Sequence, residues 1–220
     1  MLLKLFSKIL RSASLNQNAA ITDIQWMRIE AKKGNPRAQT ELAMEYILGD
    51  ELPEEPEKAV MWLLKAAKQD YADAQYLLGN CYKEGDGIKQ DFEEALRWYR
   101  EGASQNHREA QWELGVLYYN GEAVIQNYSK AFELFSKAAS QGLIDAQRAL
   151  GIMYQEGLGV EVDEVSAYIW FEIAAASDFD NRLKDMRSQI TYKLETNQIE
   201  HAKSRAKAWL EEFNGMHSSK

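Results

Sequence analysis

Residues 110–121, AQWELGVLYYNG, recur in altered form at a spacing of 36 residues and decide the fold of this chain. The opening Ala-Gln pair stands again at residues 38–39, 74–75 and 146–147. Leucine, tyrosine and glycine follow the same spacing, as Leu42, Leu78, Leu114 and Leu150; Tyr46, Tyr82, Tyr118 and Tyr154; and Gly49, Gly85, Gly121 and Gly157. Four copies in register, without an insertion, indicate four structural repeats.

Each copy carries the pattern of two helices joined by a turn. In the second copy, the spacing i, i+3, i+4, i+7, i+8 of one buried helix face is met by Ala74, Leu77, Leu78, Cys81 and Tyr82. The glycine that follows ends this helix, because glycine enters the left-handed conformation at little cost. Residues that tolerate this conformation also stand where the second helices should end: Gly34, Asp70, Asn106, Gly142 and Asp178.

The second helix of each copy begins at a residue suited to cap it. In the second copy this residue is Asp91, and Glu94 three positions later predicts a capping box. The same position holds Asn127 in the third copy, Asp163 in the fourth and, in the first, Glu55 followed by Pro56. We therefore predict four helical hairpins with these starting points.

The repeats predict an all-α fold, an α/α superhelix (solenoid) with a 36-residue period. One period before the first full copy, residues 22–34, TDIQWMRIEAKKG, match only the second helix. We expect a lone helix (a half repeat) at residues 21–34, four repeats at 35–178, C-terminal capping helices at 179–214 and a tail at 215–220. Two capping helices, at 180–194 and 198–213, would cover the last apolar face, the second starting with a capping box of Asn197 and Glu200.

Residues 1–20 form a basic amphipathic segment. Wound as a helix, they place Leu2, Phe6, Ile9 and Ala13 on one face and Lys4, Lys8 and Arg11 on the other. The lysines interrupt the apolar core that a signal peptide needs. We favour a cap on the next helix or a frayed tail; the alternative is weak docking to a membrane surface or to a partner.

The composition argues against several function classes. A net charge of −8 opposes nucleic-acid binding by phosphate neutralisation. The single cysteine, Cys81, and three histidines give no metal-ligand spacing, and no apolar run reaches the length of a membrane span. No triad, carboxylate pair or phosphate loop is present, so we expect no cofactor, no metal and no enzymatic activity. We expect a cytoplasmic protein, with membrane association or the periplasm as alternatives.

The repeat resembles a known class. The second copy, AQYLLGNCYKEGDG followed by DFEEALRWYREGA, resembles the Sel-one-like repeat (SLR) family, relatives of the tetratricopeptide repeats, and the likeness spans residues 22–178. It implies a superhelical adaptor or scaffold for other proteins, without chemistry of its own. The chain departs from the pattern where Glu51 and Ala123 replace the loop glycines seen as Gly87 and Gly159, which predicts different turns, and where Leu134 replaces the repeating tryptophan.

Recurring side chains are interpreted as packing residues. The core should hold the repeated tryptophans (Trp26, Trp62, Trp98 and Trp170), the repeated tyrosines and Cys81, an inert buried thiol. The repeated alanines, such as Ala110, should mark close approaches of two helices. Glu45 stands in the first copy at the position that Cys81 has in the second, which suggests that the first end of the repeat stack is more open. The repeated glutamines should hydrogen-bond to a neighbouring loop or repeat.

A second set of positions differs from copy to copy and lies opposite the buried face of the first helices. We call these positions the variable strip: Met44, Ile47, Tyr76, Asn80, Lys83, Trp112, Val116, Tyr119, Arg148, Ile152 and Gln155. The strip is rich in residue types that anchor interfaces, so we interpret it as a partner-binding surface on the concave side. The alternative is that these side chains pack sideways against adjacent repeats.

These observations favour a scaffold or adaptor that binds a protein or peptide with a basic or apolar surface. A second hypothesis is an immunity-type protein that neutralises a secreted effector through one tight, stoichiometric complex. A hydrolase would need a cluster of titratable groups in a cleft, and the sequence offers none.

Overall fold

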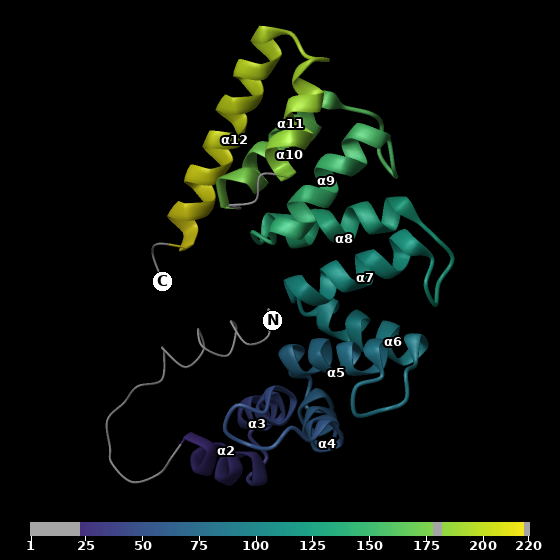
Figure 1. The fold of residues 1–220 in the computed structure, drawn as a ribbon, viewed down its shortest axis with the longest axis vertical. Helices are drawn as coiled ribbons and strands as arrows, with labels where there is room; N and C mark the ends of the chain where they lie inside the picture. Colours follow the sequence, from purple (N-terminus) through teal and green to yellow (C-terminus); the bar gives the residue numbers. More distant parts are fainter. Residues whose placement is uncertain (1–22, 178–181, 218–220) are drawn as a thin grey trace. The chain divides into compact units, whose positions relative to one another are not determined.

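The computed structural model describes residues 23–177 and 182–217, and those residues contain helices but no strand (Figure 1). The helices are α2 Asp23–Lys32, α3 Pro36–Leu48, α4 Pro56–Ala67, α5 Ala72–Glu84, α6 Phe92–Ser104, α7 Arg108–Asn120, α8 Tyr128–Ser140, α9 Ile144–Glu156, α10 Glu164–Ser177, α11 Arg182–Thr191 and α12 Thr196–His217. The expected amphipathic segment at residues 1–20 and the helix end at Asp178 lie outside the described residues.

The chain forms two compact units, Met1–Gln105 and Asn106–Lys220. In the first unit, each helix from α2 to α6 packs against the next along the chain. In the second unit the same holds from α7 to α10, and α11 and α12 both pack against α10. The α3/α4, α5/α6, α7/α8 and α9/α10 pairs are the four predicted hairpins, so the expected all-α repeat fold of the solenoid class is confirmed.

The predicted N-cap residues form cap hydrogen bonds at three of the four second helices. The side chain of Asp91 accepts hydrogen bonds from the backbone N–H groups of Glu93 and Glu94, at 3.0 and 3.1 Å. Asn127 and Asp163 cap α8 and α10 in the same way. At α4 the first helical position is a proline, and the preceding glutamate pairs with a lysine one turn into the helix instead of capping.

The capping box expected at α6 is wrong. The Asp91 N–H donates to the carbonyl of Tyr82 at 2.9 Å, because the loop returns the chain to the end of the first helix. The Glu94 carboxylate accepts from Arg97 instead, at 2.8 Å. The capping box of α12 is also displaced, since Gln198 Oε1 accepts from the Glu195 N–H at 2.9 Å, two residues before the predicted pair.

The helix ends follow the sequence pattern. Gly85 has φ 77° and its N–H donates to the Cys81 carbonyl, and Asp70 and Asn106 also have positive φ. Of the two loops predicted to differ, the one at Ala123 keeps the left-handed conformation of the family turn, with φ 57°. That expectation was therefore wrong for Ala123, and alanine accepts a conformation that glycine adopts more cheaply.

The core follows the recurring residues, with corrections at the tryptophans and the tyrosines: Tyr46 is buried, but Tyr82, Tyr118 and Tyr154 are half-buried. Ala110 and its three counterparts are fully buried, as expected for close helix approaches. Trp98 is 6% exposed and Leu134, which replaces the tryptophan in the third copy, is 5% exposed. Trp26, however, is 43% exposed, because it stands on the outer side of the first described helix, and Trp62 and Trp170 are half-buried. Glu45 is 3% exposed, so the prediction of an open end there is wrong.

The repeated glutamines join successive repeats within each unit. Gln75 is 1% exposed, and its Nε2 donates to the Ala67 carbonyl at the end of α4 (3.3 Å), while its Oε1 accepts from Gln105 at the end of α6 (2.7 Å). We call this arrangement a glutamine link. The corresponding glutamines of the other repeats also form hydrogen bonds. Gln39 bonds to Ala31 and Gln69, Gln111 bonds to Asn106 and Gln141, and Gln147 bonds to Ala139. The predicted bonds to neighbouring segments are confirmed.

The last helix covers the end of the second unit. Ala202 and Ala206 of α12 are fully buried against α10, and Trp209 packs edge-to-face on Trp170 with ring centroids 6.0 Å apart. Phe213 lies over Gly142, where an added Cβ would come within 2.4 Å of its ring. The helix thereby shields apolar groups that the fourth hairpin would otherwise expose.

Candidate functional site

A large side chain from the second helix of a hairpin lies over a small residue in the first. A Cβ added to Gly79 would be 2.5 Å from the ring of Tyr99, and one added to Gly115 would be 2.5 Å from the ring of Phe135. Gly151 lies below Phe171 in the same way, at 2.4 Å. The corresponding positions of the first repeat hold Ala43 and Leu63. A ring from the second helix therefore reaches across the first helix.

The variable strip surrounds this ring. On α5, Tyr76 and Asn80 flank Gly79 and are half-buried. The Tyr99 hydroxyl donates to Asn80 Oδ1 at 2.7 Å, and the rings of Tyr76 and Tyr99 lie 6.4 Å apart. Lys83, one turn further, is also half-buried. The strip on this helix thus rests on the aromatic core and keeps its outer side in solvent.

The third repeat carries the most aromatic part of the strip. The ring of Trp112 lies 4.8 Å from that of Phe135, and the ring of Tyr119 lies 5.2 Å from that of Tyr128, both partners belonging to α8. Val116 packs in the same cluster, and all three strip residues stay partly exposed. Trp112 and Tyr119 therefore contact the second helix of their own hairpin.

The remaining strip residues differ in character. On α9, Arg148 pairs with Asp145, and Ile152 and Gln155 are half-buried. On α3, Ile47 is half-buried, but Met44 is only 8% exposed. The expectation of a surface position is wrong for Met44, because its side chain belongs to the core of the first unit.

Cys81 and His107 both serve the fold, one as a buried core residue and the other as a helix cap. Cys81 is 4% exposed, and burial raises the pKa of its thiol to about 12, so the thiol stays protonated at neutral pH. His107 caps α7, since its Nδ1 accepts from the Ala110 N–H at 3.2 Å. Within the described part of the chain, no group of histidine, cysteine or acidic side chains could hold a metal ion, and no helix there is long and apolar enough to span a membrane.

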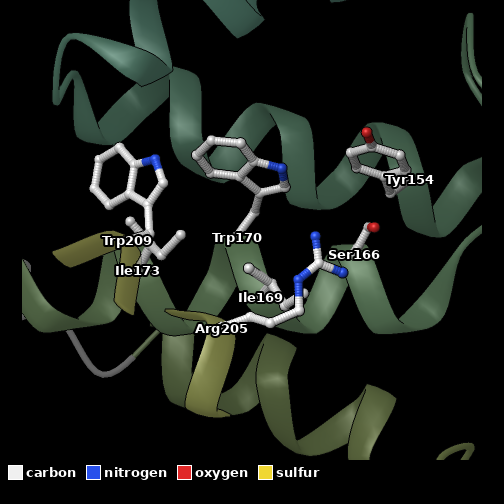
Figure 2. A pocket seen from close by; sticks show the side chains of 7 residues that line it. All are labelled: Tyr154, Ser166, Ile169, Trp170, Ile173, Arg205 and Trp209. Atoms are coloured by element: carbon white, nitrogen blue, oxygen red, sulfur yellow. The ribbon is translucent and has the colours of Figure 1, made fainter. Parts of the chain in front are cut away.

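The structure also contains a pocket that the sequence analysis missed. It has a volume of about 240 Å³, and Figure 2 shows the side chains that line it: Tyr154, Ser166, Ile169, Trp170, Ile173, Arg205 and Trp209. These residues come from α9, α10 and α12. The repeat pattern could not place the pocket, because α12 follows the last repeat and its packing has no counterpart in the period.

The Sel1 repeat pattern matches residues 36–71, 72–107, 108–143 and 144–179. This chain belongs to the Sel1 repeat family. Proteins of this family generally mediate protein–protein interactions and are typically non-enzymatic scaffolds.

Solved structures agree with the family assignment. A protective antigen of uropathogenic Escherichia coli with an SLR fold is 31% identical, with a TM-score of 0.82 over 94% of this Sel1 repeat chain and 44% of the antigen. A Sel1 repeat protein of Oxalobacter formigenes is 30% identical, with a TM-score of 0.67 over 83% of this chain and 74% of that protein. This chain thus spans less than half the length of the antigen. No curated protein matches the sequence.

Proposed function

We propose that this chain is a non-enzymatic scaffold that binds a partner protein or peptide along the variable strip. The observation that carries the proposal is the partly exposed aromatic surface of Trp112 and Tyr119, whose rings pack against Phe135. Tryptophan and tyrosine are enriched among the residues that dominate binding energy. A surface held by the core loses little side-chain freedom on binding, which favours affinity.

The chemistry of the strip restricts the partner. The chain has a net charge of −8, so a partner with a basic or apolar surface is favoured over an acidic one. Val116 and Ile152 offer apolar contacts, and the charge of Lys83 is paired with Glu84 at 3.5 Å. An extended peptide or a helix that presents apolar anchors between basic side chains would fit this pattern.

The test compares binding with folding. The partner would first be isolated with the intact protein, and its dissociation constant measured by calorimetry. We expect the combined substitution Trp112→Ala and Tyr119→Ala to weaken binding about 30-fold or more, the effect of losing a hot spot. Because both rings also contact α8, the variant should lose some stability, and circular dichroism would verify that it remains folded at the assay temperature.

Leu134→Ala is the matched control. Leu134 is 5% exposed on α8, so its truncation lowers stability by about 2–5 kcal/mol without changing the strip. We expect the affinity of this variant to stay that of the parent. Equal weakening in both variants, or none in the Trp112 and Tyr119 variant, would contradict the proposal. A 1:1 complex that neutralises a toxic effector would identify the immunity-type role instead.

A further inference from the structure

The pocket between α9, α10 and α12 contains two polar groups that form no hydrogen bond or direct ion pair with the described residues. Figure 2 shows the Arg205 guanidinium directed into the space between Trp170 and Ser166, with the Tyr154 side chain at the same end and its hydroxyl on the far side of the ring. Arg205 is an exposed residue that forms no direct ion pair with the described residues, although it interacts electrostatically with Asp163 and Tyr154. The Tyr154 hydroxyl forms no hydrogen bond with any residue that the structure describes. A guanidinium and a phenol hydroxyl both donate hydrogen bonds.

Asp163 interacts electrostatically with Arg205 but forms no direct ion pair with it, and its oxygens accept hydrogen bonds from other groups. Asp163 Oδ1 accepts from the N–H groups of Val165 and Ser166, both at 3.0 Å. Its Oδ2 accepts from the Ser166 hydroxyl at 2.6 Å. Asp163 therefore serves as the cap of α10, and the guanidinium keeps its donors for a ligand.

The opposite end of the pocket is apolar and fixed in place. The indoles of Trp170 and Trp209 meet edge-to-face, and Trp209 in turn stacks on Phe213, with centroids 5.0 Å apart and the planes within 8°. Phe213 is held over Gly142, so the position of Trp209 is determined by packing on both sides. Ile173 of α10 lines this end beside Trp209.

We propose that this pocket binds a carboxylate carried on an aromatic or branched apolar group. The carboxylate would accept hydrogen bonds from Arg205, since the guanidinium fork matches carboxylate geometry. The apolar group would lie on Trp170, Trp209 and Ile173. At about 240 Å³ the pocket is below the usual range of roughly 300–1,000 Å³ for small-molecule sites, so it takes one ring with one polar group.

The same aromatic walls could suggest a cage for a cationic ligand. Tryptophan and tyrosine faces attract quaternary ammonium groups. Arg205 opposes this interpretation, because its positive charge lies at the pocket and no acid of the described residues forms a direct ion pair with it. The ligand is therefore an anion. A polypeptide chain end and a small aromatic acid both supply this chemistry.

The experiment follows the indole N–H signals of the full-length protein by NMR during titration with N-acetyl-L-phenylalanine. The signals of Trp170 and Trp209, assigned through Trp→Phe substitutions, should shift, whereas that of Trp62 in the first unit should not. N-acetyl-L-phenylalaninamide, which lacks the carboxylate, should bind at least tenfold more weakly. Choline should produce no shift.

Two variants complete the test. Arg205→Gln should weaken binding of the free acid at least tenfold, and Lys203→Gln, which removes a charge from the same helix outside the pocket, should not. Equal binding of acid and amide, an unchanged affinity in Arg205→Gln, or a response to choline would overturn the proposal. A tetrapeptide ending in phenylalanine that binds more tightly than the single residue would identify a chain end as the source, and equal binding a small acid; both results support the proposal. The site is separate from the variable strip, so either proposal can fail alone.

Discussion

At the scale of single residues, the ring of Phe135 occupies the space above Gly115 that a side chain would need. Glycine weakens a helix by about 1 kcal/mol relative to alanine, so propensity alone would favour alanine at this position. The ring is 2% exposed and packed on all sides, so it cannot move away cheaply. Packing against Phe135, and not helix propensity, therefore explains the glycine at position 115.

We expect Gly115→Ala to lower the free energy of unfolding by about 1–3 kcal/mol through overpacking, in spite of the gain in helix propensity. Denaturation in guanidinium chloride would measure the change. Asn120→Ala, at an exposed position of the same helix, is the control and should leave stability nearly unchanged. A more stable Gly115→Ala variant would show that the ring does not press on this position.

The contact between Phe135 and Gly115 also explains why the sequence pattern did not predict the half-burial of Trp112 and Tyr119. Treating a first helix alone, the angular positions of Trp112 and Tyr119 lie opposite the buried stripe and predict a free surface. The ring that crosses at Gly115 belongs to another helix, and a one-helix calculation does not include it. The strip positions were thus found from the pattern, but their half-burial and the burial of Met44 required the packing of two helices.

At the scale of helices and turns, the sequence predicted most of what the structure shows. Cap residues such as Asp91 and Asn127, and helix ends such as Gly85 and Asp70, act through neighbouring backbone groups, so local spacing is sufficient to find them. The capping box of Glu94 failed because the Asp91 N–H bonds to a residue nine positions earlier. The glutamine links were expected as bonds, but their partners depend on how successive helices stack.

The glutamine link makes a prediction about an exposed residue. Gln105 lies at the surface, yet its amide is the donor to Gln75 Oε1, which is buried. We expect Gln105→Ala to lower the free energy of unfolding by about 1–3 kcal/mol, the effect of leaving a buried acceptor unpaired. Urea denaturation would measure it.

Gln189→Ala is the control for this prediction. Gln189 is exposed on α11 and takes no part in a glutamine link, so its substitution should change stability by less than about 0.5 kcal/mol. If both glutamine variants behave alike, the link contributes nothing beyond an ordinary surface residue.

At the scale of the whole molecule, α2 leaves two large apolar side chains in solvent. Trp26 is 43% exposed and Ile29 is 45% exposed. Residues 1–20, which lie outside the described residues, contain apolar positions spaced for one helix face. This surplus of exposed apolar surface favours the interpretation of the segment as a cap over its alternative as a membrane-surface anchor.

We expect deletion of residues 1–20 to lower the melting temperature and to increase binding of an apolar dye, because Trp26 and Ile29 would stay uncovered. Differential scanning calorimetry and dye fluorescence would measure both changes. In the Trp26→Gln variant, deletion of residues 1–20 should lower the melting temperature less than it does in the parent, because one of the two apolar side chains that the segment would cover is absent. The membrane alternative predicts a different result: unchanged melting, together with loss of co-sedimentation with anionic phospholipid vesicles.

The glutamine link has a consequence for how such a chain can change in length. The Gln75 amide joins the end of α4 to the end of α6, and a single residue inserted into or deleted from the intervening turn would rotate it away from its partners. Duplication or excision in steps of one complete copy keeps the bonds of the link, whereas any other step breaks them. The array can therefore be lengthened or shortened by genetic recombination or by design only in whole modules, each bringing its own surface positions to vary.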